Sequence, residues 1–158
     1  MKINKYIIRE KRKGFKTYYQ ILDEFENSIT QISFKFSGMM NAVDFGGARY
    51  TMKKRSMFSY RHDIFKDGVL ICDAGLKNGF SSEWLIQFSK STIYMKSKLS
   101  FKNISFIENE NEIAKASRKN KGFKTIFGLA VNENIDAMVL IISLVTRLKQ
   151  IRATMAAT

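Results

Sequence analysis

The chain contains no proline, one cysteine and one histidine among its 158 residues. Without proline, and without a long Gly- or Ser-rich stretch, it has no segment typical of a linker, so we expect one domain over residues 1–158. The single Cys72 excludes an intramolecular disulfide, and with the lone His62 it provides too few ligands for a Cys/His zinc site. We therefore expect a reducing, intracellular setting and neither a metal nor a cofactor.

Two further absences concern location and activity. The apolar run at residues 6–8 ends at Arg9 and is too short for the core of a signal peptide, so we expect a cytoplasmic protein. Neither Cys72 nor any serine has a recognisable catalytic partner in the sequence. His62 is the single side chain whose ordinary pKa lies near neutrality, as a general acid or base requires. The sequence therefore favours a binding protein over an enzyme.

Acidic residues are scarce as well: 14 Asp and Glu stand against 27 Lys and Arg, a formal charge of +13. Such an excess attracts anionic surfaces through a long-range field that salt weakens. A lysine-rich surface also serves solubility alone. The charge thus points to a class of partner, anionic lipid or nucleic acid, and does not choose between them.

What the sequence does contain is strand periodicity, since polar and apolar side chains alternate through most of the first 131 residues. Residues 23–27, 66–68 and 108–111 are typical of hairpin turns and make the neighbouring strands antiparallel. They recur at intervals of a little over forty residues, as in a weak internal repeat. The predicted strands cover about residues 2–9, 16–22, 28–36, 42–45, 49–55, 59–66, 69–74, 84–89, 92–98, 103–108, 112–119 and 124–131.

The C-terminal segment has a different pattern, because residues 137–145 are almost uninterruptedly apolar. We predict a helix over about 135–152, with Asn134 as N-cap, Asp136 in the first turn, and basic residues toward its C-terminal end, namely Arg147, Lys149 and Arg152. A helix that is apolar on every face must be surrounded by protein or by lipid. The run is shorter than the ~20 residues of a bilayer span, so we favour a core helix over a tail anchor and expect no transmembrane span.

These patterns together predict a mainly β fold: a closed antiparallel barrel of about twelve strands around a hydrophobic C-terminal central helix. A sheet wrapped around the helix buries its whole circumference and also removes exposed strand edges. An open sandwich would leave part of the helix in water at a cost of about 25 cal/mol per Å² of apolar area.

The hairpins at 19–23 and 64–68, the closing strand at 127–131 and the helix from Ile135 resemble the tubby C-terminal-like superfamily, and within it the LURP-one-related proteins, which are related in fold to phospholipid scramblases. The resemblance covers nearly the whole chain and implies a barrel of twelve strands enclosing a hydrophobic helix. It also implies an association with membrane lipids: tubby domains bind phosphoinositide headgroups, and scramblases act on phospholipids with calcium. No phosphoinositide-binding motif carries over residue by residue.

The sharpest local feature is a repeated pentapeptide, Lys-Gly-Phe-Lys-Thr, at residues 13–17 and 121–125, each copy placed just before a predicted strand. Glycine allows a turn with exposed N–H groups between two lysines, which is a cradle for phosphate, and the phenylalanine can insert at a bilayer surface. The alternative is a pair of basic turns of a duplicated hairpin. Our candidate residues for binding an anion or lipid are Arg9, Lys11, Arg12, Lys13, Lys16, Arg118, Lys119, Lys121 and Lys124.

We expect a non-enzymatic, cytoplasmic protein that docks peripherally on anionic phospholipid headgroups through these basic turns. The alternative is an interaction scaffold or nucleic-acid-binding protein that uses the same positive surface, including the cluster of Arg49 and residues 53–55 beside the aromatic row of Phe58, Tyr60 and Phe65. The acidic turns at 23–27 and 108–112 offer oxygens to calcium but match no EF-hand spacing.

Overall fold

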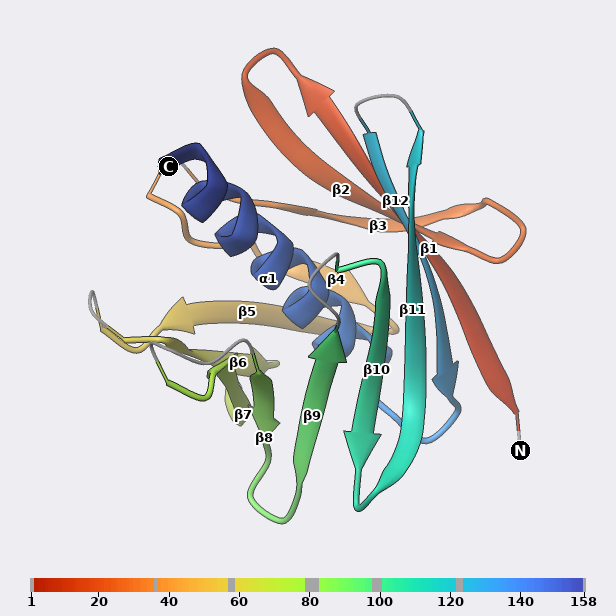
Figure 1. Ribbon diagram of the computed structural model, residues 1–158, viewed down its shortest axis with the longest axis vertical. Helices are drawn as coiled ribbons and strands as arrows, with labels where there is room; N and C mark the ends of the chain where they lie inside the picture. The colour runs from red at the N-terminus through yellow and green to blue at the C-terminus, as the bar shows by residue number, and fades with distance from the viewer. Residues whose placement is uncertain are drawn as a thin grey trace.

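The computed structural model describes residues 2–35, 37–56, 59–78, 83–97, 101–121 and 124–157. Their secondary structure is twelve strands followed by one helix (Figure 1). The strands are β1 (Ile3–Lys13), β2 (Lys16–Asp23), β3 (Ser28–Ser33), β4 (Val43–Phe45), β5 (Ala48–Lys54), β6 (Arg61–Lys66), β7 (Val69–Leu76), β8 (Trp84–Gln87), β9 (Thr92–Ser97), β10 (Asn103–Glu108), β11 (Asn111–Lys121) and β12 (Lys124–Asn132), and the helix is α1 (Ala137–Ala157).

All twelve strands belong to one antiparallel sheet in the order β3-β2-β1-β12-β11-β10-β9-β8-β7-β6-β5-β4. The pairing of β1 with β12 brings the two ends of the strand sequence together. The edge strands β3 and β4 meet through a bridge between Phe34 and Met40, and the Asn41 N–H donates to the Ser33 carbonyl at 2.8 Å. The sheet is therefore a nearly closed barrel, with a seam between β3 and β4.

The helix α1 lies within the ring of strands, as expected (Figure 1). Residues 137–146 are all buried. Ten successive residues make almost three helical turns, so the helix is buried on every face over this length. The inward-facing rows of the strands supply the surrounding surface, for example Ile64, Ile104 and Phe127, each at most 1% exposed. Closure of the sheet is thus explained by the apolar surface that it covers.

Three details differ from the sequence predictions. The helix begins at Ala137, and Asp136 rather than Asn134 caps it, since the Asp136 carboxylate accepts from the Met138 N–H at 3.1 Å and from the Tyr50 hydroxyl at 2.9 Å. It also continues to Ala157, so the basic side chains predicted for its end lie inside it. Strands β1 and β11 extend beyond their predicted limits because they form long hairpins with β2 and β12.

Antiparallel pairing puts the connections alternately at two ends of the barrel. One end, which we call the acidic end, holds the three predicted hairpin turns and the start of α1. Its acidic residues are Asp23, Glu24, Glu26, Asp44, Asp67, Glu108, Glu110, Glu112, Glu133 and Asp136, most of the 14 in the chain. The other, the basic end, holds both pentapeptides, the β3–β4 connection and the C-terminal half of α1. The barrel therefore carries its charge asymmetrically along its axis.

Candidate functional site at the basic end of the barrel

The β1–β2 hairpin presents the first pentapeptide at its tip. Lys13 and Lys16 are directly opposite one another and close the turn. Gly14 has φ of +64°, a left-handed conformation that glycine adopts without strain. Phe15 is fully exposed beside it. A large aromatic ring in water between two lysines has no role in the core, so its position calls for a functional explanation.

The second pentapeptide closes the β11–β12 hairpin, where Lys121 pairs with Lys124, and its tip, Gly122 and Phe123, lies outside the described residues. Because β1 and β12 are neighbours, both pentapeptides are at the same end of the barrel. Pairing of β1 with β12 stops at Arg9 and Ile126, and beyond that point the two hairpins diverge (Figure 1). The two pentapeptides therefore lie at the same end of the barrel but belong to two separate hairpins.

The nine candidate residues are divided between the two faces of the sheet. Strand alternation places Arg9, Lys11 and Lys119 outside, where the Arg9 guanidinium is 2.9 Å from the Glu26 carboxylate. Alternation places Arg12 and Arg118 in the inward rows that contain Glu10 and Ala116. Lys13 and Lys16 are at the β1–β2 tip, and Lys121 and Lys124 end their strands.

At the point of divergence, Arg152 of α1 holds β1 and β12 together. Its guanidinium forms an ion pair with Glu10 and donates to the Thr125 hydroxyl at 2.8 Å. Glu10 is 1% exposed, so this carboxylate depends on Arg152 for its countercharge. The contact fixes the C-terminal half of the helix at the basic end.

Two adjoining cavities open beside this half of the helix. The first has a volume of 350 Å³ and is lined by residues of the β1–β2 hairpin, the β3–β4 connection and α1, including Lys16, Tyr19, Lys35 and Lys149. The second, of 260 Å³, lies between the β3–β4 connection, α1 and the strands β5 and β6. Phe34, Gly38 and Lys149 line both. Sequence reasoning missed Lys35 and Lys149 as site residues, because their convergence depends on where the seam and the helix meet.

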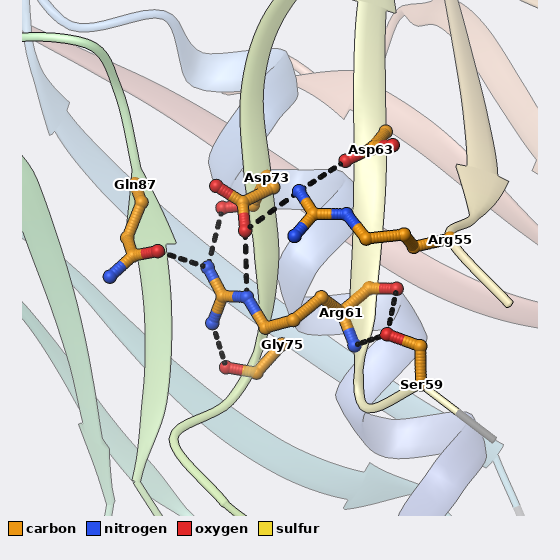
Figure 2. A network of polar contacts seen from close by, with 7 residues as sticks. All are labelled: Arg55, Ser59, Arg61, Asp63, Asp73, Gly75 and Gln87. Carbon is orange, nitrogen blue, oxygen red and sulfur yellow. Dashed lines mark hydrogen bonds and ion pairs between the residues drawn. The ribbon is translucent and has the colours of Figure 1, made fainter.

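Several other basic residues have structural partners and do not belong to this site. Figure 2 shows a network in which Arg61 donates to the Asp73 carboxylate at 2.8 Å and to the Gly75 carbonyl at 3.0 Å. Arg55 is 2.8 Å from Asp63 in the same network. Arg49 is at the acidic end, bound to Asp44 at 2.9 Å. The cluster proposed for nucleic acid is thus partly neutralised and divided between two ends, and Phe58 lies outside the described residues.

The acidic turn of residues 23–27 is stabilised by its own hydrogen bonds. Asp23 accepts from the N–H groups of Phe25 and Asn27, each at 2.9 Å. The Asn27 contact is the main reason that the pKa of Asp23 lies below its usual value. Among the described residues, no three His, Cys, Asp or Glu side chains are grouped to hold a metal ion.

His62 and Cys72 are both buried. Burial lowers the pKa of His62, an effect larger than the opposing hydrogen bond to the main chain of Ala74, and the ring stacks on Trp84 at 6.1 Å. Burial likewise raises the pKa of the Cys72 thiol to about 12, which leaves little thiolate at neutral pH. Cys72 is therefore a structural apolar side chain, and His62 is a neutral ring that lines the second cavity.

The lowered pKa of His62 predicts an acid-dependent loss of stability. The unfolded chain binds this proton more readily than the folded protein, so the free energy of unfolding should fall as the pH decreases from about 7 to about 5. Replacing the single histidine by glutamine (H62Q) should flatten this slope. Urea unfolding at several pH values measures it, and an unchanged slope in H62Q would show that His62 is not the responsible group.

The fold and site define the class of this protein: a nearly closed antiparallel barrel of twelve strands with a core helix and a basic, cavity-bearing end. No protein-family model, no curated protein and no solved structure matches the chain. In the part of the chain that the structure describes, no helix combines the length and apolar character needed to cross a membrane.

Proposed function

We propose that this protein binds peripherally to membranes that contain anionic phospholipid, with the basic end of the barrel toward the headgroups, and that it acts without catalysis in the cytoplasm. The observation that carries the proposal is Phe15, fully exposed at the tip of a hairpin between Lys13 and Lys16. An exposed aromatic ring flanked by lysines suits the boundary between headgroups and acyl chains, where the ring is buried and the ammonium groups remain near phosphates.

The charge asymmetry supports one orientation. Each lysine or arginine near an anionic surface contributes about 1 kcal/mol, and acidic residues near that surface oppose binding. At the acidic end, cations such as Arg49 and Lys66 are already close to Asp44 and Asp136. At the basic end, by contrast, Lys16, Lys35 and Lys149 have no carboxylate partner among the described residues. An anionic surface therefore favours approach by the basic end.

The architecture also agrees with what the resemblance to the tubby C-terminal-like superfamily implies, a twelve-stranded barrel around a hydrophobic helix. We include membership of that superfamily in the proposal. Its association with membrane lipids points in the same direction as the charge and Phe15, although neither observation depends on it.

Co-sedimentation with phosphatidylserine-containing vesicles tests the proposal. F15A should weaken binding by about tenfold or more, because burial of a phenylalanine contributes about 1.5–3 kcal/mol. K13Q/K16Q should weaken it by roughly thirtyfold at low salt, from about 2 kcal/mol of lost attraction. F25A is the matched control: Phe25 is also strongly exposed, but it lies in an acidic turn at the opposite end of β2, so vesicle binding should not change.

Two results would contradict the proposal. One is equal, negligible sedimentation with neutral and anionic vesicles. The other is tight, salt-dependent binding of single-stranded oligonucleotides that vesicles do not displace, which would assign the same basic end to nucleic acid. A loss of vesicle binding in F25A equal to that in F15A would contradict the orientation alone.

A further inference from the structure

The seam of the barrel brings together three lysines that have no acidic partner in the part of the chain that the structure describes. Lys16 comes from the β1–β2 hairpin, Lys35 from the β3–β4 connection and Lys149 from α1, and all three line the first cavity. Arg152 lines it too, but its charge is already balanced by Glu10. The cavity is therefore positively charged, and the cations come from three elements that meet only in the folded barrel.

Lys149 lines both cavities, as Phe34 and Gly38 do. Its ammonium lies 4.0 Å from the centre of the Phe34 ring and 3.4 Å from the Gly38 carbonyl oxygen. Burial lowers its pKa, so the charged form loses hydration that these two neutral contacts replace only in part. An anion beside Lys149 would supply the missing countercharge.

The lining of the second cavity includes two methionines. Met39 and Met52 contribute flexible side chains that adapt to the shape of a ligand, and Phe34 continues this surface from the first cavity. His62, Thr146 and Lys54 lie among the other lining residues. Protein ligand pockets commonly have volumes of about 300–1,000 Å³, and the two adjoining cavities together fall in that range.

From this arrangement we propose that the seam binds a single-chain amphipathic anion, such as a fatty acid, with its headgroup in the first cavity near Lys16, Lys35 and Lys149 and its hydrocarbon chain against Met39 and Met52 in the second. The lining residues favour an amphipathic anion over two simpler ligands. A small inorganic anion would not fill the second cavity beside the methionines, and a neutral hydrocarbon would provide no negative charge for the lysines. The site goes beyond membrane docking, because the β1–β2 hairpin, the β3–β4 connection and α1 form its walls and a ligand can occupy it without a bilayer.

The protein contains its own reporter for this site. Trp84 is the single tryptophan and stacks on His62, which lines the second cavity. Titration with decanoate below its micelle concentration, in the absence of vesicles, should give a saturable change in tryptophan emission. Decanol has the hydrocarbon chain of decanoate without its charge, and inorganic phosphate has a negative charge without a hydrocarbon chain. Both should bind at least about tenfold more weakly than decanoate.

Two variants locate the binding. K149M keeps an unbranched side chain that is one atom shorter, removes its charge, and should weaken decanoate binding by about tenfold. A153F adds a ring at an exposed position of α1 that lines the second cavity and should reduce binding without a change of charge. K90M is the control for K149M, since Lys90 is an exposed lysine at the acidic end and its loss should leave the affinity unchanged. Thermal unfolding of each variant verifies that it is folded.

The proposal fails if decanoate gives no saturable change, if decanol binds as tightly as decanoate, or if K149M and A153F both bind like the unaltered protein. These results are separate from those of the vesicle experiment, because docking is measured by sedimentation of the protein and ligand binding by fluorescence in solution. Phe15 and Lys16 also line the first cavity, but Lys13 lines neither cavity, so weaker vesicle binding of K13Q with unchanged decanoate affinity would identify two distinct sites.

Discussion

Replacing Gly75 by alanine should destabilise the protein by about 3 kcal/mol or more. A Cβ atom at this position would lie 1.9 Å from the Tyr60 carbonyl oxygen, 2.8 Å from the Tyr60 carbonyl carbon and 3.0 Å from the Arg61 Cα. These are main-chain atoms, so no side-chain rotation can relieve the overlap. The end of β7 would have to move away from β6, and the hydrogen bond from Arg61 to the Gly75 carbonyl would be lost as well (Figure 2).

Gly128 is the matched control for this substitution. It also lies within a strand, β12, but a Cβ there meets no atom within 4 Å, and its φ is not positive. G128A should therefore leave the free energy of unfolding unchanged or raise it slightly, since alanine restricts the unfolded chain more than glycine does. Urea denaturation of both variants measures the difference. Equal stabilities of G75A and G128A would show that β6 and β7 do not approach as closely as described.

Replacing Arg152 by methionine should destabilise the protein about as much as G75A does. R152M retains much of the apolar stem but leaves Glu10 buried without its countercharge, and breaking a buried ion pair in this way costs about 3 kcal/mol or more. Because a proton can neutralise the isolated carboxylate, the destabilisation should shrink as the pH is lowered. Urea unfolding of R152M and of the unaltered protein at neutral and acidic pH measures both effects.

The double variant E10Q/R152M is the control, since it removes both charges and leaves no unpaired carboxylate. It should recover a large part of the stability that R152M loses, because replacing both partners of a buried pair costs much less than replacing one. If the double variant is less stable than R152M, Glu10 does not depend on Arg152, and the contact at the point where β1 and β12 diverge has another role.

The sequence was sufficient to predict the elements and their arrangement because both depend on local patterns. Alternation located all twelve strands, and the unbroken apolar run at residues 137–145 required a helix enclosed on every side. The limits of the elements were less well predicted. The cap at Asp136 depends partly on the hydroxyl of Tyr50 from a distant strand, and the length of β1 and β11 depends on hairpins that extend beyond the body of the barrel.

The candidate site was predicted only in part. The pentapeptides were visible as a repeated motif, and the pairing of β1 with β12 places them at one end of the barrel. Lys35 and Lys149 carry no local pattern that separates them from the other lysines, so they were missed. Conversely, Arg49 and Arg55 looked like part of a basic cluster, but the carboxylates of Asp44 and Asp63 on the strands adjacent to β5 bind them.

The amino-acid sequence by itself determined that this protein is a barrel of antiparallel strands around its C-terminal helix, because the period of apolar residues sets which face of each element leaves water. Only the tertiary structure decided which cations lie beside carboxylates, where a Cβ atom at Gly75 would overlap the main chain, and that acidic and basic turns occupy opposite ends. Those properties depend on distances between residues far apart in the chain, which side-chain periodicity does not encode.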